Sequence, residues 1–429
     1  MKILIISRTP WNSDNSFGNT FTNLFENMEK VEIYHICCQG GETKESLAKK
    51  TFQMTEQQIL KNRKDIGVFV NTVAKETKGK FYKNRLKKIN NFKRLTILYI
   101  IRDLIWKFGN VKFSLKLSNF LKEVKPDIIY LPIYNSWYMC DIQNYICDQY
   151  KNIPVIGHIS DDVYSYTKGY FISPIEVFYK FILRSKLKKI IKKCFYLEVF
   201  AENMKIEYEK IFDKKCFLIG KGINVDKIDG IEFKTTKDFS QLLKFVYTGN
   251  LGNNRWKIVY ELGKSLERLS STKKAILEIY SGTVLSNKIK KKFVECKNIK
   301  FMGEVDSKVA REVQNNSDVL VHVESFDIKS ICSTRMSFST KIIDYLCTGN
   351  LVLAIGPSIV NSIEVIKENN LGVVESNIEN IDNTVLKILL NKVDKESIQN
   401  NVNSYLKTQR NIKIIQKEMY KRMLKLIKN

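Results

Sequence analysis

Residues 337–357 constrain the fold more than any other stretch, because they combine a short helix, a tight turn and a buried strand. Ser339 and Thr340 are hydroxyl residues suited to cap a helix, and the residues after them are apolar at helical spacing. Gly349 supplies the left-handed conformation that ends such a helix. The continuous apolar run at 351–355 has the length of a buried strand. The segment therefore predicts one unit of an α/β domain with a parallel sheet.

Two charged residues lie on this predicted helix at positions that core packing does not require. Lys341 and Asp344 are three residues apart and share one face. A lysine in the first turn is unfavourable beside the helix dipole unless an anion is bound there, and the N–H groups at a helix start, near Thr340, can bind phosphate. Asp344 could then accept hydrogen bonds from sugar hydroxyls. A salt pair on a solvent-exposed helix is the simpler explanation of an isolated Lys-x-x-Asp.

Length and composition indicate two globular domains in a reducing compartment. The 429 residues are too many for one ordinary core and fit two domains of roughly 200 residues each. The nine cysteines are scattered without a C-x-x-C pair, and only three histidines are present, so neither a disulfide framework nor a metal site is indicated. No apolar run suits a signal peptide or a membrane-spanning helix, and we expect a cytoplasmic protein.

The net charge of +26 favours partners that carry negative charge. A basic amphipathic helix predicted within 83–107 could lie on an anionic membrane surface, and a second basic amphipathic helix is predicted at 177–193. The first of them could equally pack on a sheet with its lysines in water. No aromatic-basic recognition motif accompanies the charge, so we expect no nucleic-acid partner.

Strand-length apolar runs alternate with helical stretches in both halves of the chain, which predicts two Rossmann-like α/β domains. Residues 43–124 lack strand patterning. Residues 225–241 are polar without periodicity and are interpreted as a linker, and residues 410–429 as a final basic helix. Strands are expected at 2–7, 31–38, 127–131, 154–159, 197–200 and 216–219, and then at 244–248, 277–280, 300–302, 319–323, 351–355 and 372–374.

In each domain one loop follows the first predicted strand, at the carboxyl edge where such sheets bind ligands. The loop at 8–18 reaches Gly18, which could let a substrate approach the backbone. The loop at 249–257 carries Gly249 and Gly252 and opens a helix, a place where N–H groups and a cation can hold a pyrophosphate. Taken alone, each loop also fits a plain turn.

His158 and Asp161 follow a strand of the first domain, at the same carboxyl edge. A histidine there could contact a ligand and is a candidate catalytic residue, although a lone histidine is more often structural. Asp161 could act as a base or orient His158, and an exposed acidic turn is the simpler account.

Residues 338–350 resemble the signature F-(P/S)-(S/T)-K-x-x-E-Y-L-A-x-G-x-P of GT-B glycosyltransferases of family 4, with Lys341, Asp344 and Gly349 on its marked positions. Residues 202–224 resemble the end of that family's N-terminal domain. The resemblance implies two Rossmann-like, doubly wound domains that face each other across a cleft, with the last helix packed back on the first domain. The implied divisions are an acceptor-binding domain at 1–224, the linker at 225–241, a nucleotide-sugar-binding domain at 242–405 and the returning helix at 406–429.

The same resemblance implies a retaining, metal-independent enzyme that takes a nucleotide-diphosphate sugar as donor and needs no cofactor. Asp344 would hold the ribose of the nucleotide, one methylene shorter than the usual glutamate. The loop at 249–257 resembles the family segment Y-x-G-x-l-x-x-x-R/K, so Arg255 is the expected phosphate partner and Lys257 the second. Lys341 and Arg255 would stabilise the charge that develops on the leaving diphosphate.

The acceptor implied by the resemblance is a glycan or a lipid-linked sugar in cell-surface polysaccharide synthesis. It would enter through the first domain near Gly18, His158 and Asp161. A membrane-bound acceptor would place the protein on the inner face of the membrane.

One departure from the family pattern lies eight residues before Asp344, where a glutamate usually contacts the sugar and this chain has Met336. A thioether is a poor hydrogen-bond acceptor. Arg335, Asp327 or Glu324 could compensate from the same loop. Two alternatives therefore stand beside a transferase, namely an inactive glycosyltransferase-like partner subunit and a sugar-nucleotide epimerase on the same fold.

Overall fold

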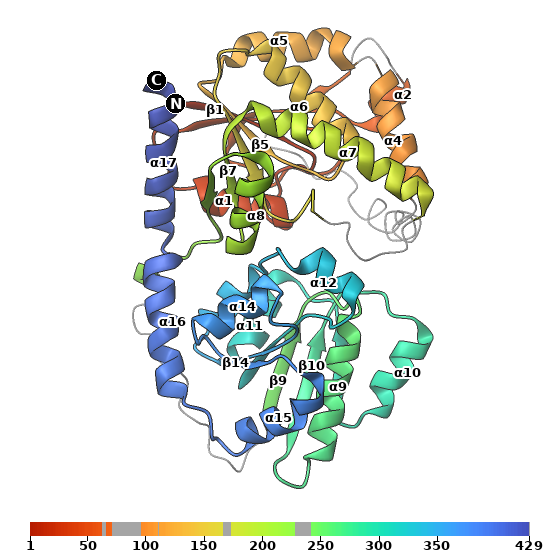
Figure 1. Cartoon of the computed structure of the whole chain (residues 1–429), viewed down its shortest axis with the longest axis vertical. Helices are drawn as coiled ribbons and strands as arrows, with labels where there is room; N and C mark the ends of the chain where they lie inside the picture. The colour runs from red at the N-terminus through yellow and green to blue at the C-terminus, as the bar shows by residue number, and fades with distance from the viewer. Residues whose placement is uncertain (62–65, 71–95, 110, 166–172, 228–241, 429) are drawn as a thin grey trace. The chain divides into compact units, whose positions relative to one another are not determined.

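The computed structural model describes residues 1–61, 66–70, 96–109, 111–165, 173–227 and 242–428 (Figure 1). They form two compact units. Of the described residues, the first unit contains 1–165, 173–219 and 415–428, and the second contains 220–227 and 242–414. Most of the linker expected at 225–241, and the part of the basic helix expected before residue 96, lie outside the described residues.

The first unit is built on an eight-stranded sheet in the order β4-β3-β2-β1-β5-β6-β7-β8, parallel except for the β3–β4 pair. The central strands are continuous apolar runs because helices cover both faces of such a sheet. The strands are β1 (Lys2–Ser7), β2 (Glu32–Cys37), β3 (Ala48–Gln53), β4 (Val68–Val70), β5 (Ile128–Pro132), β6 (Val155–Ile159), β7 (Cys194–Val199) and β8 (Cys216–Leu218). The main helices are α1 (Ser16–Phe25), α2 (Glu56–Lys61), α4 (Thr96–Phe108), α5 (Leu115–Val124), α6 (Trp137–Gln149), α7 (Pro174–Lys193) and α8 (Glu202–Phe212).

Strands β3 and β4 correct the expectation that residues 43–124 contain no strand. Lys49 and Lys50 are adjacent and exposed in the middle of β3, and they break the apolar pattern by which a strand is recognised. The strand forms nevertheless because its backbone pairs with β2 and because Lys49 reaches Glu32 at 3.2 Å. Near the edge of a sheet, such charged residues are common.

The second unit contains a six-stranded, all-parallel sheet in the order β11-β10-β9-β12-β13-β14. Its strands are β9 (Leu243–Thr248), β10 (Ala275–Tyr280), β11 (Ile299–Gly303), β12 (Val319–Val323), β13 (Leu351–Ile355) and β14 (Val373–Glu375). Its helices are α9 (Arg255–Arg268), α10 (Asn287–Glu295), α11 (Ser307–Asn315), α12 (Ile328–Thr334), α13 (Lys341–Leu346), α14 (Asn361–Glu368), α15 (Ile381–Leu389) and α16 (Lys395–Gln409).

The strand order reverses direction between β9 and β12, so the chain leaves these two neighbouring strands toward opposite sides. A crevice at the carboxyl ends of two such strands is where doubly wound sheets bind ligands. In the second unit, this switch point lies between the loop that follows β9 and the loop that follows β12. The first unit has its own switch point between β1 and β5.

The last helix, α17 (Ile412–Lys428), begins in the second unit, and from Ile415 onward it belongs to the first. Met419 and Met423 are fully buried in the core of the first unit, and Gln416 donates a hydrogen bond to the carbonyl of Asn23 at 3.0 Å. Among the helices of the described residues, none combines the length and apolar character needed to cross a bilayer.

Candidate nucleotide-sugar site

The loop after β9 is fixed tightly at both of its ends. Gly249 donates its N–H to the carbonyl of Tyr280 at 3.0 Å, and a Cβ atom at Gly249 would lie only 3.1 Å from Lys341 Nζ. At the other end, Asn253 and Asn254 both have positive φ angles, 51° and 58°. Asparagine adopts this conformation more readily than most residues. The glycine therefore lets the loop pass close to the lysine.

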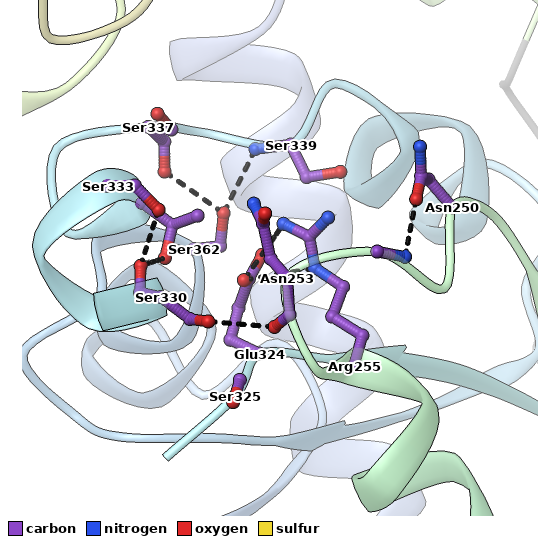
Figure 2. A network of polar contacts seen from close by, with 12 residues as sticks. Asn250, Asn253, Arg255, Glu324, Ser325, Ser330, Ser333, Ser337, Ser339 and Ser362 are labelled. Atoms are coloured by element: carbon purple, nitrogen blue, oxygen red, sulfur yellow. Dashed lines mark hydrogen bonds and ion pairs between the residues drawn. The ribbon is translucent and has the colours of Figure 1, made fainter. Parts of the chain in front are cut away.

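Side chains from the start of α12 hold the strained end of this loop. Ser330 Oγ donates to the carbonyl of Asn253 at 2.9 Å (Figure 2). Asn254 Nδ2 donates to Asp327 Oδ2 at 3.2 Å. The same Asp327 carboxylate caps α12 through the N–H of Ser330. The loop after β9 is thus positioned by the segment that follows β12, which brings both sides of the switch point together.

Arg255, the first residue of α9, forms a bidentate ion pair with Glu324, which directly follows β12. Arg255 Nε lies 3.1 Å from Glu324 Oε2, and Nη2 lies 2.9 Å from both carboxylate oxygens (Figure 2). The Glu324 side chain is 4% exposed and that of Arg255 is 22% exposed. Burial raises the pKa of Glu324 above its ordinary value, although Arg255 opposes this effect. The buried carboxylate therefore fixes the direction of the guanidinium, whose outer part remains accessible.

Lys341 lies on α13 and points toward the end of β9, where Nζ donates to the carbonyl of Thr248 at 3.3 Å. Within the described residues no carboxylate oxygen lies within 4 Å of this ammonium group. Burial lowers the pKa of Lys341, and the positive charge of Arg255 lowers it further, while Asp344 partly opposes both. The two cations are therefore close enough to repel each other, and among the described residues Lys341 has no ion-pair partner within 4 Å.

The pKa of His322, on β12, is also affected by the charges of these two cations. Burial lowers the pKa of His322 to about 3, and the charges of Arg255 and Lys341 contribute. Its Nε2 atom is buried without a hydrogen-bond partner and lies 3.7 Å from Glu324 Oε1. His322 could not be identified as a site residue from the sequence, because an apolar strand with one histidine is an ordinary core pattern.

Helix α13 is anchored by hydrogen bonds that fix the position of Lys341. Tyr345 Oη donates to the carbonyl of Thr248 at 3.1 Å and also contacts Thr248 Oγ1 at 2.9 Å. On the other side, the N–H of Ser339 donates to Ser362 Oγ at 2.9 Å, and this hydroxyl donates to the carbonyl of Ser337 at 3.2 Å (Figure 2). The lysine is thus carried by a short helix that is fixed at its start and in its middle.

The expected side-chain capping of α13 by Ser339 or Thr340 is wrong. Thr340 has helical angles, φ −60° and ψ −19°, and its hydroxyl makes no capping bond. The N–H groups of Ile342 and Ile343 already bond to the carbonyls of Ser339 and Thr340. A backbone turn therefore takes the place of the hydroxyl cap.

Asp344 lies one turn after Lys341 and forms an ion pair with Lys221. The Asp344 side chain is 40% exposed and that of Lys221 is 17% exposed. Lys221 is held in place because its segment pairs with residues 410–412 through hydrogen bonds between Ile223 and the backbone of Arg410 and Ile412. Lys221 could not be predicted as the partner of Asp344, because it lies 123 residues away in the chain.

The remaining residues expected in the second unit lie around this cluster. Lys257 is exposed on the first turn of α9, and Gly252 is half-buried in the loop. Met336, at the position where the family has a sugar-binding glutamate, is 1% exposed and belongs to the interior. It therefore cannot present its side chain to a sugar. Of its suggested substitutes, Glu324 holds Arg255 and Asp327 caps α12.

His158 is enclosed in the core of the first unit. Its Nδ1 atom lies 2.9 Å from Tyr130 Oη and its Nε2 atom lies 3.0 Å from Ser160 Oγ, while Phe21 and Phe200 pack against the ring. Burial lowers the pKa of His158 to about 3, so the ring is neutral at physiological pH. A ligand would reach this histidine only by displacing Ser160.

The other two expected residues of the first unit differ in exposure. A Cβ atom at Gly18 would lie 2.1 Å from the carbonyl oxygen of Asn12, so the backbone that approaches Gly18 closely is that of the loop after β1. Asp161 is exposed just beyond β6. Both residues belong to the first unit, whereas the cluster around Lys341 belongs to the second.

Comparison with known proteins gives a match in structure only. No family model matches this chain, and no curated protein matches its sequence significantly. The structure is similar to sucrose-phosphate synthase from Thermosynechococcus elongatus, with 12% identity, a TM-score of 0.60 and 99% of each chain covered. It is similar to HepE from Anabaena in complex with UDP and glucose, with 10% identity, a TM-score of 0.62 and coverage of 99% of this chain and 100% of that one.

A third similar structure is WaaG, a glycosyltransferase involved in lipopolysaccharide biosynthesis, with 12% identity, a TM-score of 0.54 and coverage of 97% and 98%. These similarities extend over nearly the whole chain. They confirm the predicted fold class, an α/β protein with two Rossmann-like domains of the GT-B type. At such low identity, the similarity establishes the fold and leaves the chemistry to be argued from the residues.

Proposed function

We propose that this protein is a glycosyltransferase that takes its sugar from a nucleotide-diphosphate donor, and that the second unit binds the donor. The observation that carries the proposal is the pair formed by Lys341 and Arg255 at the switch point of the second sheet. Arg255 is half-buried, Lys341 is partly exposed, and the two cations repel each other; since Lys341 has no carboxylate partner in the described residues, they form a site that an anion stabilises. A diphosphate supplies two such anionic groups.

The proposed chemistry follows from where negative charge appears during transfer. When the bond between the sugar and the diphosphate breaks, charge accumulates on the leaving phosphate oxygens. Lys341 and Arg255 would stabilise that charge, and because both are already fixed, little reorganisation is needed during the reaction. Glu324 would act as a positioning residue, since it holds the guanidinium without itself facing the donor.

Asp344 is proposed to hold the ribose of the nucleotide. In the unliganded chain its carboxylate is bound by Lys221, so ribose hydroxyls would take over part of this contact. Lys257 and the backbone at Gly249, Gly252 and Thr340 would complete the nucleotide site.

Support for a nucleotide-diphosphate sugar, as opposed to another anion, comes from two sources. The segment 338–350 resembles the family 4 signature, and the structurally similar HepE was solved with UDP and glucose. Retention of configuration, and a glycan or lipid-linked acceptor in cell-surface polysaccharide synthesis, rest on the family resemblance and form the finer part of the proposal. The acceptor would bind the first unit near Gly18, His158 and Asp161.

The role of Asp344 can be separated from that of the cations by comparing two ligands. UDP contains a ribose and inorganic pyrophosphate does not. We expect Asp344→Asn to weaken UDP binding about tenfold, the loss of hydrogen bonds to a charged group, and to leave pyrophosphate binding unchanged. Isothermal titration calorimetry on the parent and the variant measures both. Equal weakening of the two ligands would show that Asp344 does not hold the ribose.

The competing functions differ from a transferase in turnover. A panel of UDP, GDP and ADP sugars, incubated with the protein and monitored for free nucleotide, tests an inactive partner subunit, which would release none. An epimerase would change the sugar without an acceptor and without releasing nucleotide. Release of nucleoside diphosphate that depends on an added acceptor is the result that the proposed function requires.

A further inference from the structure

Helix α4 of the first unit has charged side chains pointing into the protein and apolar side chains pointing outward, which is the reverse of the usual arrangement. The side chains that point into the protein include an ion pair, Arg102 with Asp103 at 2.9 Å, in which the carboxylate is 1% exposed. The side chains that point outward are large and apolar, at the helical spacing of 97, 101, 104 and 108. Ile97 is 51% exposed and Phe108 is 66% exposed. A helix whose outer neighbour is water normally shows the opposite arrangement.

The inward polar face is fully engaged, so this orientation of α4 is specified by the fold. Asp103 accepts hydrogen bonds from Tyr179 Oη at 2.9 Å and from the N–H of Trp137 at 3.3 Å. Arg102 donates to Ser136 Oγ at 3.0 Å. Rotating α4 to bury its apolar face would break all of these hydrogen bonds. The apolar stripe is therefore held on the outside.

Helix α7 lies against α4 (Figure 1), and Tyr179 of α7 contacts Asp103 and Tyr99 of α4. In the first half of α7, Val177 is 54% exposed and Phe181 is 75% exposed. Lys188 and Lys192 follow Phe181 at intervals of seven and eleven residues, so they lie on the same face about two and three turns further along. Both lysines are exposed. One outward face thus changes from apolar to cationic along the helix.

The charge of α7 is predominantly positive, although Lys180, Lys186 and Lys193 form ion pairs with Glu176, Asp141 and Asp148. Helix α7 contains seven lysines and arginines and a single acidic residue, Glu176. Outward-facing α4 adds Lys107 and no exposed acid. We name the α4–α7 surface by the residues that define it, which are Ile97, Ile101, Leu104, Phe108, Val177 and Phe181 with Lys188 and Lys192.

We infer that the α4–α7 surface docks onto a lipid bilayer that contains anionic phospholipids. Apolar side chains in rows beside lysines match the chemistry of the bilayer interface, where acyl chains lie below a layer of negatively charged headgroups. A protein partner would need acidic groups to meet the lysines beside an apolar strip, whereas a bilayer offers both at every point. The inference is independent of donor binding, and it adds the surface through which a membrane-bound acceptor would be reached.

The test is flotation of the full chain with vesicles in the absence of sugar nucleotide. We expect binding to vesicles of phosphatidylcholine with phosphatidylglycerol, and little binding to phosphatidylcholine alone. Replacing Ile101 and Phe181 together by serine should lower the partition coefficient roughly tenfold or more, because two large apolar side chains lose their insertion. Lys188→Gln with Lys192→Gln should lower it roughly fivefold for each lysine, and added salt should do the same.

The matched controls are two exposed apolar side chains that lie outside the α4–α7 surface. Ile206 on α8 is 64% exposed and Val294 on α10 is 83% exposed, and their serine variants should bind the vesicles as the parent does. Equal binding to neutral and anionic vesicles, or equal loss in the control variants, would overturn the inference. So would a dimer that disappears in Ile101→Ser with Phe181→Ser, since the surface would then join two copies. If the protein binds the vesicles but UDP, GDP and ADP leave its melting temperature unchanged, the proposed donor site is rejected and this inference stands.

Discussion

Lys341→Met is expected to weaken binding of nucleoside diphosphates ten- to hundredfold and to raise the melting temperature of the unliganded protein. The loss of binding corresponds to removing one charge-assisted contact to phosphate. The gain in stability has a separate cause. Part of the Lys341 side chain is exposed, but desolvation of its ammonium group and repulsion by Arg255 lower its pKa, and no carboxylate lies within 4 Å in the described residues, so the folded state is penalised for its charge. Methionine fills a similar volume without that charge.

The hydrogen bond that this substitution removes costs little. The Thr248 carbonyl, which accepts from Lys341 at 3.3 Å, also accepts from Tyr345 Oη at 3.1 Å, so it keeps a partner in the variant. When a functional residue is held in an unfavourable environment, replacing it is expected to stabilise the protein and to abolish ligand binding. A residue with a purely structural role would destabilise the fold when replaced.

The gain should depend on pH with a definite sign. Because the pKa of Lys341 is lower in the folded than in the unfolded chain, the penalty is fully present below the folded pKa. It disappears as the pH rises toward the unfolded value, which is near 10.5. The stability difference between Lys341→Met and the parent should therefore be larger at neutral pH than at pH 10.

Differential scanning fluorimetry with a titration of UDP, GDP or ADP measures both effects. Lys300→Met, at an exposed position on β11, is the matched control and should change neither the affinity nor the melting temperature. The donor-site assignment fails if Lys341→Met still binds the preferred nucleotide as tightly as the parent does.

The arrangement of this site shows which parts of a fold a single sequence can reveal. Arg255 and Lys341 were expected to lie together because both come from segments that follow parallel strands, and such segments gather at one edge of the sheet. The apolar run of β13 was equally readable, and its bounds, Leu351–Ile355, agree with the expected 351–355. Patterns that repeat over a few residues are local, and local patterns can be recognised in a single sequence.

The partners of these cations could not be predicted in the same way. Glu324 lies 69 residues from Arg255, and Lys221 lies 123 residues from Asp344. Nothing in the spacing of either residue points to the other, because such pairs are created by the path of the chain in space. The same holds for β3, where a tertiary contact outweighs two adjacent lysines. Charges in a binding site are therefore easier to foresee than the groups that position them.

Arg422→Met is the substitution expected to destabilise the protein most. Arg422, on the final helix, donates from Nη2 to Glu198 Oε1 at 3.0 Å, and the Glu198 side chain is 0% exposed. Tyr130 Oη donates to the other carboxylate oxygen at 2.6 Å. Removing the arginine leaves a carboxylate buried without a cation, which typically costs about 3–5 kcal/mol. We expect a loss of that order in the free energy of unfolding of the first unit.

The double variant Glu198→Met with Arg422→Met tests whether the loss comes from the unpaired charge. A buried ion pair that is replaced by apolar residues of similar size often costs little, so the double variant should recover most of the stability lost in Arg422→Met. Lys421→Met, which removes an exposed ion pair with Glu418 from the same helix, should change the free energy by less than about 0.5 kcal/mol.

The pH dependence of the Arg422→Met variant provides the second readout. Burial already raises the pKa of Glu198 above its ordinary value, and loss of Arg422 removes the cation that opposes this rise. A group whose pKa is raised on folding destabilises the folded state increasingly as the pH rises above its unfolded pKa, because the carboxyl must then ionise in the core. Urea unfolding followed by tryptophan fluorescence should therefore show a smaller defect at pH 5 than at pH 8. A loss of stability of equal size at both pH values would mean that the charge of Arg422 contributes little. The arginine would then stabilise α17 by packing on Phe217, whose ring centroid lies 4.5 Å from Arg422 Cζ.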